Sequence, residues 1–250
     1  MCFEYDKHTK EDGDMYMELN HICFAYENKE ILKDISFGLE RGEIVGLIGA
    51  NGAGKTTTIR TMMKKLKPQA GTITIKGKNI NDYLRTSFPV SYIPDEPVYY
   101  EELTMMEHFD FVKALYPKCN VDVDSLIKRF ELEEHLYKVP GLLSKGTLQK
   151  MMIVVALIRE FDVLLADEPM TGLDPKQISV LKDTFSELKE QKKAVLISTH
   201  LLDLAENFCD KYIFINKGIV VAYGSKEDIA AKAKIESLAS LEQIYLAMIN

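Results

Sequence analysis

Residues 46–57, which read GLIGANGAGKTT, constrain the fold of this chain more than any other stretch. Four glycines fall within nine positions, and Lys55 follows the last of them. The segment just before, residues 43–49, is short and almost continuously apolar, which is typical of a buried parallel strand. A helix is predicted to begin at Lys55. A glycine-rich turn between such a strand and a helix lets main-chain N–H groups close around a bulky anion. The segment therefore predicts an α/β fold with an anion site.

The spacing of this turn matches the P-loop pattern, and the strand before it and the helix after it are the expected context. In a P-loop the lysine bridges the β- and γ-phosphates of a nucleotide, and the next hydroxyl ligates Mg²⁺. We predict these roles for Lys55 and Thr56. The alternative is a glycine-rich turn with an unrelated lysine. The predicted nucleotide-binding residues of the loop are Gly49, Ala50, Asn51, Gly52, Ala53, Gly54, Lys55, Thr56 and Thr57.

A second segment, VLLADEP at residues 163–169, supplies the carboxylates that a P-loop ATPase needs. Four apolar residues predict a buried strand, and its end would carry Asp167 and Glu168 beside the P-loop. We predict that Asp167 holds Mg²⁺ through water and that Glu168 is the general base that orients the attacking water. The alternative is a strand that ends in two solvated carboxylates.

Hydrophobic periodicity extends the α/β pattern along the chain. Between residues 101 and 160 the period is helical, which indicates a helical insertion. A parallel sheet with helices on both faces is the expected architecture. Ser225 and Asp228 predict a capping box that begins a last helical region. Strands are predicted over residues 17–25, 34–40, 162–167 and 194–199, helices over 55–67, over 201–209 and after Asp174, and hairpins over 71–80 and 212–224.

Composition excludes several classes of protein. The net charge of −7 argues against a general nucleic-acid-binding surface. No apolar run approaches the length of about 18 residues that spans a bilayer, and the N-terminus has no secretory signal. The four cysteines are scattered and form no C-x-x-C pair, so a reducing cytoplasm is expected and a disulfide framework or zinc site is not.

Together these residues resemble the nucleotide-binding subunit of an ABC transporter. The resemblance covers roughly residues 17–225. It implies a P-loop NTPase fold with a RecA-like parallel-sheet core, an antiparallel β subdomain and a helical insertion, with ATP and Mg²⁺ as cofactors. The expected organisation is a flexible N-terminal extension over residues 1–15, an ABC ATPase domain over 16–226 with its helical subdomain over about 97–160, and a helical C-terminal tail over 227–250.

The segment LLSKGTLQK stands where this family has its LSGGQ signature, 23 positions before Asp167. Ser144 and Gly146 match the signature, whereas Lys145 and Thr147 depart from it. In the family, the signature opens a helix that faces the γ-phosphate bound to the other subunit of a head-to-tail dimer. A hydroxyl, a glycine and a helix N-terminus do make an anion site. The alternative is an ordinary N-capped helix.

Three shorter segments agree with the resemblance. Residues 172–174, GLD, match the D-loop that communicates across the dimer, and they also suit a helix cap. His200 follows a predicted strand and matches the switch histidine that contacts the γ-phosphate. Tyr26 matches the aromatic residue that stacks on adenine. A structural histidine and a core tyrosine are the alternatives.

Asp95 departs from the family pattern. The family has a glutamine after the proline in a segment like SYIPDEPVYYEELT, and this chain has an aspartate there. A carboxylate can ligate Mg²⁺ directly or through water, although it adds negative charge near ATP. We predict a metal-ligating role for Asp95, with a solvated loop carboxylate as the alternative.

The segments around residues 92–109 and 143–150, together with the C-terminal SLEQIYLAM, resemble the ATP-binding subunits of ABC-2-type bacterial exporters, especially the Ecs type. The resemblance implies a catalytic pair, Glu168 and His200, in an ATP-driven dimer with a second ATPase subunit, either identical or a paralogue. It also implies a separate integral-membrane permease subunit, which docks on residues 95–108 at the inner face of the cell membrane, and no nucleic-acid partner.

Three other functions are compatible with parts of the pattern. An importer ATPase would use the same chemistry with a solute-binding protein, but no long regulatory C-terminal domain follows the cassette. A soluble ABC protein acting on DNA or ribosomes usually carries coiled coils or two cassettes. A non-hydrolysing binding module is disfavoured because Lys55, Asp167, Glu168 and His200 are all present.

Overall fold

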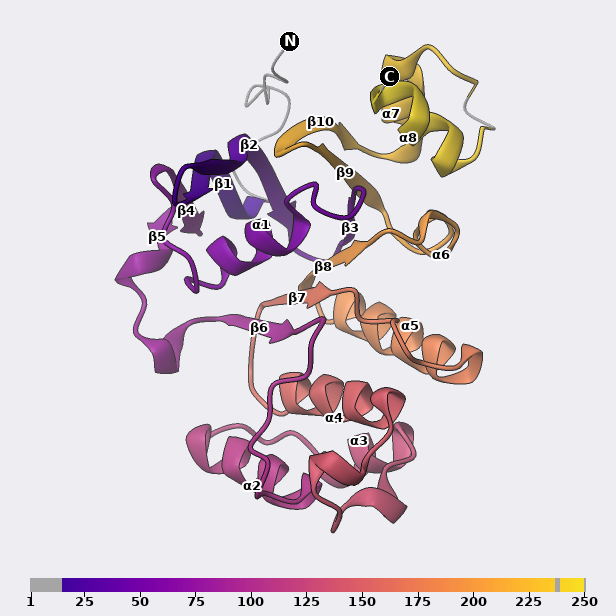
Figure 1. The fold of residues 1–250 in the computed structure, drawn as a ribbon. Coiled ribbons are helices and arrows are strands. Elements are labelled where there is room, and N and C mark those ends of the chain that lie inside the picture. The colour runs from indigo at the N-terminus through magenta and orange to yellow at the C-terminus, as the bar shows by residue number, and fades with distance from the viewer. Residues whose placement is uncertain (1–14, 237–238, 250) are drawn as a thin grey trace.

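The computed structural model describes residues 15–236 and 239–249 (Figure 1). The predicted N-terminal extension over residues 1–15 lies outside the described residues, except for Met15, which begins the first strand. Two sheets and a set of helices make up the described part of the chain. The mixed α/β class with a parallel-sheet core, predicted from the sequence, is confirmed.

The larger sheet has six strands in the order β10-β9-β3-β8-β7-β6. Neighbouring strands are parallel except for the β9–β10 hairpin at one edge. The short apolar runs predicted as buried strands are β3, β7 and β8, and every residue in them is buried. The strands are β3 (Ile44–Ile48), β6 (Val90–Ile93), β7 (Val163–Asp167), β8 (Ala194–Thr199), β9 (Lys211–Asn216) and β10 (Ile219–Gly224).

The smaller sheet is antiparallel, with the order β2-β1-β4-β5. The predicted hairpin over residues 71–80 forms its edge, as β4 and β5. The first two strands are longer than the alternation of apolar residues indicated, because both continue into their exposed connecting turn. The strands are β1 (Met15–Tyr26), β2 (Lys29–Glu40), β4 (Ala70–Ile75) and β5 (Lys78–Asn79).

Successive residues of the parallel strands face two separate cores, as the two-residue period of a strand requires. Val45 and Leu47 of β3 pack with the antiparallel sheet and α1, whereas Ile44 packs on the opposite face with the helices. In β7, Leu165 packs on the face of Val45 and Leu47, and Leu164 packs on the face of Ile44. Both faces of the sheet are covered, which explains why its strands read as continuous apolar runs.

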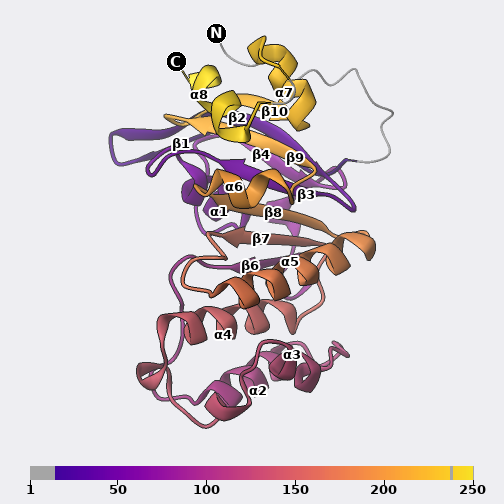
Figure 2. The same ribbon diagram turned by 90° about the vertical axis from the view of Figure 1, so that its right-hand side faces the viewer.

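The helices lie at the two ends of the molecule and on both faces of the larger sheet. Helices α2, α3 and α4 lie together at one end of the molecule, and α7 and α8 lie at the other, while α1 and α5 flank the sheet (Figures 1 and 2). The helices are α1 (Lys55–Met62), α2 (Met105–Leu115), α3 (Val123–Arg129), α4 (Lys145–Leu157), α5 (Pro175–Glu190), α6 (Leu202–Glu206), α7 (Lys226–Ala233) and α8 (Leu241–Ile249). Short 3₁₀ turns span Ile80–Asp82, Arg85–Ser87, Glu133–His135 and Pro140–Leu142. No helix of the described ranges is long and apolar enough to cross a bilayer.

The prediction that the first helix continues to Pro68 is wrong. Helix α1 ends at Met62, because Lys64 adopts a left-handed conformation with φ +57° and the N–H of Lys65 donates back to the Arg60 carbonyl. The Lys64 ammonium then donates to the Tyr83 carbonyl at 2.8 Å. The predicted helix over residues 201–209 is also shorter, since α6 ends at Glu206.

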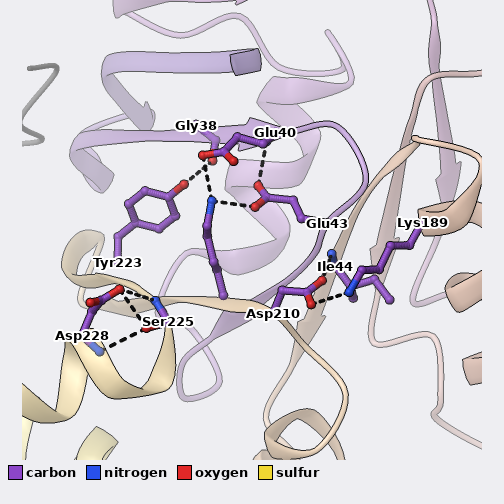
Figure 3. Close-up of polar contacts among 10 residues, drawn as sticks. Gly38, Glu40, Glu43, Ile44, Lys189, Asp210, Tyr223, Ser225 and Asp228 are labelled. Atoms are coloured by element: carbon purple, nitrogen blue, oxygen red, sulfur yellow. Dashed lines mark hydrogen bonds and ion pairs between the residues drawn. The ribbon is translucent and has the colours of Figure 1, made fainter. Parts of the chain in front are cut away.

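Polar contacts fasten the C-terminal hairpin to the rest of the molecule (Figure 3). The Tyr223 hydroxyl donates to the Gly38 carbonyl of β2 at 2.9 Å, and Asp210 accepts from the Ile44 N–H at 2.8 Å. The predicted capping box is confirmed, because Ser225 and Asp228 exchange side-chain and backbone hydrogen bonds at the start of α7. The hairpin is thereby fixed beside β3, the strand that leads into the P-loop.

Candidate active site

The glycine-rich loop lies between β3 and α1, near the middle of the parallel sheet. Gly52 and Gly54 have positive φ angles of +79° and +114°, which favour glycine. A Cβ atom on Gly49 would lie 2.4 Å from the Ile215 carbonyl, so packing also requires that glycine. A Cβ on Gly52 would meet no atom of the described chain within 4 Å, so the loop is open at this point. The loop therefore has both the tight turn and the open side that a phosphate site needs.

Lys55 is the first residue of α1, and its side chain is 6% exposed. Its ammonium donates to the Gly49 carbonyl at 2.7 Å and lies 3.5 Å from Glu168 Oε1. The charge therefore lies between its own loop and Glu168. Thr56 is half-buried, and Thr57 is buried.

Asp167 ends β7 and is fully buried. Its Oδ1 accepts a hydrogen bond from the Ser198 hydroxyl at 2.5 Å. Among the described residues, its Oδ2 is buried without a hydrogen-bond partner. A buried carboxylate oxygen without a partner is costly, so a cation beside Oδ2 would suit this site. Ser198 was not predicted, because nothing in the run AVLIST marks its hydroxyl as different from that of a core residue.

Glu168 follows β7 in a left-handed conformation with φ +46°, which is uncommon for a residue with a Cβ. Its N–H donates to both the carbonyl and the hydroxyl of Ser198, each at 3.1 Å. Its Oε1 lies 3.0 Å from His200 Nδ1 as well as 3.5 Å from the Lys55 ammonium. A strained backbone held by neighbouring contacts is typical of functional positions. The Glu168 carboxylate, just after β7, thus contacts residues that follow β3 and β8.

Asp95 follows β6 on the loop beyond Pro94. Partial burial raises the pKa of its carboxyl, and repulsion from Asp167 and Glu168 raises it further, with Lys145 opposing. The loop therefore brings a third carboxylate near the other two. Extra negative charge at this point also favours a bound cation.

The predicted metal ligands would supply only part of the coordination shell of Mg²⁺. No cluster of three or more His, Cys, Asp or Glu side chains in the described ranges is arranged to hold a metal by itself. Mg²⁺ usually keeps several waters and binds through one or two carboxylates plus substrate phosphates. The unpartnered Oδ2 of Asp167 suits that mode of binding.

Tyr26 and His200 are exposed, as ligand-contacting side chains would be. Tyr26 ends β1 and is 42% exposed, with its ring packed edge-to-face on Phe24 at 4.8 Å. The His200 side chain is 47% exposed. The ring of Tyr26 therefore has a free surface on which a flat base can stack.

Ser144 caps the N-terminus of α4, and its hydroxyl accepts from the Thr147 N–H at 3.1 Å. A Cβ on Gly146 would lie 2.5 Å from the Gly172 carbonyl, so the signature segment packs closely against the GLD segment. Within the part of the chain that the structure describes, no hydrogen bond joins Ser144 to Lys55 or Glu168. One set of predicted site residues thus lies at the ends of β3, β7 and β8, and the other lies at the start of α4.

Comparisons with known proteins agree with this geometry. The family model described as "ABC transporter" matches residues 32–171. The ABC-type transporter ATP-binding protein EcsA of Bacillus subtilis (strain 168) is 38% identical, over 93% of this chain and 96% of that protein. The SkfA peptide export ATP-binding protein SkfE of the same organism is 34% identical, over 81% and 86%.

A solved structure, described as the ATP binding subunit of an ABC transporter, superimposes with a TM-score of 0.88. It is 35% identical and covers 94% of this chain and 100% of its own. In this chain, the glycine-rich loop, the acidic pair at residues 167–168 and the histidine just after β8 thus occur in a sequence and a fold that match known ABC ATP-binding subunits. This chain belongs to the ABC transporter family, as an ATP-binding subunit that hydrolyses ATP.

Proposed function

We propose that this chain powers export through a separate integral-membrane subunit, by ATP-driven head-to-tail dimerisation with a second ATPase subunit. One observation carries the proposal. Lys55 and His200 both contact Glu168, whereas Gly146, at the start of α4, packs against Gly172 of the same chain. A γ-phosphate held beside Lys55 and His200 would gain its second set of contacts from another copy.

ATP binding uses the loop of residues 49–57 and the exposed ring of Tyr26. The main-chain N–H groups and the N-terminus of α1 hold the phosphates, and adenine stacks on Tyr26. The Lys55 ammonium leaves the Gly49 carbonyl and pairs with the β- and γ-phosphates. This exchange replaces a neutral acceptor with charged ones, which form stronger hydrogen bonds.

Glu168 is the general base of the hydrolysis. Its carboxylate accepts a proton from water while the water oxygen bonds to the γ-phosphorus, and the bond to the β–γ bridging oxygen breaks to release ADP. His200 contacts the γ-phosphate and orients Glu168 through Nδ1. Thr56, Asp167 and Asp95 would hold Mg²⁺, which supplies neutralisation of phosphate charge when it is bound.

The second subunit completes each site. Ser144 and Gly146 of one chain face the γ-phosphate held by the other, so ATP bridges only the closed dimer. A ligand with contacts in only one state shifts the population toward that state. Hydrolysis removes the bridging γ-phosphate and lets the dimer reopen.

The segment over residues 95–108 is the docking surface for the membrane subunit. Val98 is 72% exposed and Tyr100 is 55% exposed, and the ring of Tyr100 packs edge-to-face on Phe111 of α2 at 5.7 Å. The loop is held from behind by buried His108, which accepts from the Tyr100 N–H at 3.0 Å and uses its other ring nitrogen on the Thr104 carbonyl. A rigid loop with exposed aromatic side chains suits a protein partner.

The name of the relative SkfE, a peptide export ATP-binding protein, supports export rather than import, and the likeness to EcsA favours the Ecs type. The ATPase domain would span residues 16–226, with residues 97–160 as its helical subdomain and 227–250 as a tail. The working place of the protein would be the inner face of the cell membrane.

A native pull-down tests the proposal. Tagged Glu168→Gln protein is expressed in its own host, loaded with ATP, extracted gently from membranes and analysed by mass spectrometry. A stoichiometric multi-span membrane protein is expected, and its recovery should fall when Tyr100→Ala and Phe111→Ala are added. Recovery with ribosomal or DNA-bound proteins alone would overturn the transport function, and recovery with an extracellular solute-binding protein would overturn export.

A further inference from the structure

The C-terminal helix reaches the glycine-rich loop. The N–H of Ala50, inside the loop, donates to the hydroxyl of Tyr245 on α8 at 3.2 Å. The two residues are 195 positions apart in the sequence. A side chain from the last helix therefore contacts the backbone of the loop that follows the first parallel strand.

Packing fixes the position of this hydroxyl. Tyr245 is 8% exposed, and its ring meets Phe214 of β9 edge-to-face at 5.3 Å. Both rings belong to a core cluster that includes Ile48, the last residue of β3 before the loop. The ring has little freedom in this cluster, so its hydroxyl is held at a defined place beside Ala50.

Helices α7 and α8 also contact α6, the helix that follows His200. Glu206 of α6 accepts from the Lys226 ammonium at 2.7 Å and from the Leu241 N–H, at the start of α8, at 3.1 Å. Ala205 of α6 lies in the core cluster of Tyr245. Helices α7 and α8 therefore contact α6, and α8 also contacts the glycine-rich loop.

The β9–β10 turn makes a second contact with the glycine-rich loop. The N–H of Gly218, in the β9–β10 turn, donates to the Ala53 carbonyl at 2.9 Å. The loop is thus held at Ala53 by the hairpin and at Ala50 by the tyrosine. These contacts leave the side at Gly52 open.

We propose that Tyr245 is a positioning residue for ATP binding, which holds the phosphate-binding loop in its open-sided shape before the nucleotide arrives. The inference rests on the proposed role of residues 49–57. Without the hydroxyl, the Ala50 N–H turns to water and the loop samples more conformations. Ordering the loop then opposes binding, whereas the hydrolysis step, carried by Glu168, is unchanged.

The test is Tyr245→Phe in the full-length chain, because this change keeps the ring and removes only the hydroxyl. We expect the KM for ATP and the Kd of a non-hydrolysable ATP analogue to rise about 2- to 10-fold, the effect of one hydrogen bond. The kcat should stay within about twofold, since only binding is affected. Tyr137→Phe is the matched control, because that tyrosine is 85% exposed, and it should leave both constants unchanged.

Two results would overturn the inference. One is a KM and Kd equal to those of the Tyr137→Phe protein. The other is a lower unfolding temperature with an equal loss of kcat, which would mean that the hydroxyl supports only the fold. Lys55→Ala separates this inference from the proposed function. If Lys55→Ala binds the analogue as tightly as the unmodified chain, the loop assignment itself fails, whatever Tyr245→Phe does.

Discussion

At the carboxyl ends of β3, β7 and β8, the Lys55 ammonium and His200 Nδ1 both lie within 3.5 Å of Oε1 of Glu168. At the start of α4, by contrast, the hydroxyl of Ser144 accepts a hydrogen bond from the Thr147 N–H and so caps its own helix. Gly146 packs against Gly172. The first group is assembled by parallel strands whose ends must meet at one edge of a sheet. The second group lies on a helical insertion with no such constraint. In the proposed function, the first group would hold the nucleotide of its own chain and the second would contact the nucleotide held by another copy.

The largest effect is expected for Glu168→Gln, which changes the first group. The amide cannot accept a proton, so hydrolysis should fall about 10²- to 10⁴-fold while ATP binding persists. Phosphate release and nucleotide binding are measured on the same preparation. Phosphate release at the level of the unmodified chain would remove Glu168 from the base role.

A change in the second group should have a smaller effect that depends on the partner chain. In Gly146→Ala, the new Cβ meets the Gly172 carbonyl, so the signature and GLD segments must move apart. Hydrolysis should fall about tenfold, by loss of one or two contacts to the γ-phosphate. Nucleotide binding at low protein concentration should be unchanged. Both are measured across a range of protein concentrations.

Gly141→Ala is the matched control for this change, because its new Cβ would meet no atom of the described chain within 4 Å. It should hydrolyse ATP normally. Equal losses in the two variants, or weaker nucleotide binding by Gly146→Ala at low protein concentration, would contradict the division of the site between two chains.

Asp95→Gln should have a mild effect on hydrolysis. The change removes repulsion between Asp95 and the two carboxylates that raise its pKa, and an amide oxygen still ligates a hard cation. The rate should stay within about fivefold of the original at saturating Mg²⁺. Total loss of activity would show that the carboxylate has a task beyond replacing the usual glutamine.

The smallest effect is expected for the pH dependence of folding stability, through the contact between Glu206 of α6 and Lys226 of α7. The hydrogen bond from Lys226 holds the pKa of Glu206 below its ordinary value of 4.5. The unfolded chain then binds more protons than the folded one as the pH falls, so this stabilisation is complete above pH 4.5 and is lost below it. Glu206→Gln should lower the free energy of unfolding by about 1 kcal/mol at pH 7 and by less below pH 4.5. Urea unfolding measures the difference. A constant difference between pH 7 and pH 3.5 would contradict this assignment.

The local elements of the fold, and the residues proposed to bind the nucleotide of their own chain, could be predicted from the sequence. The buried runs that became β3, β7 and β8 carry their own pattern, because both faces of a central parallel strand are covered. The P-loop spacing and the Ser225 capping box are also local, since they depend on residues a few positions apart. The acidic pair at residues 167–168 could be placed near the loop because it follows one of those strands.

The tertiary structure alone decided features that depend on contacts between distant residues. Helix α1 stops early where Lys64 turns left-handed, and the Lys64 ammonium donates to the Tyr83 carbonyl, 19 positions away. Strand β6 was not predicted, because four residues at a sheet edge carry too little periodicity to identify a strand. The partners of Asp167 and Ala50, Ser198 and Tyr245, come from 31 and 195 positions away. A hydroxyl in an apolar run has no local signature, since its partner is supplied only when the chain folds.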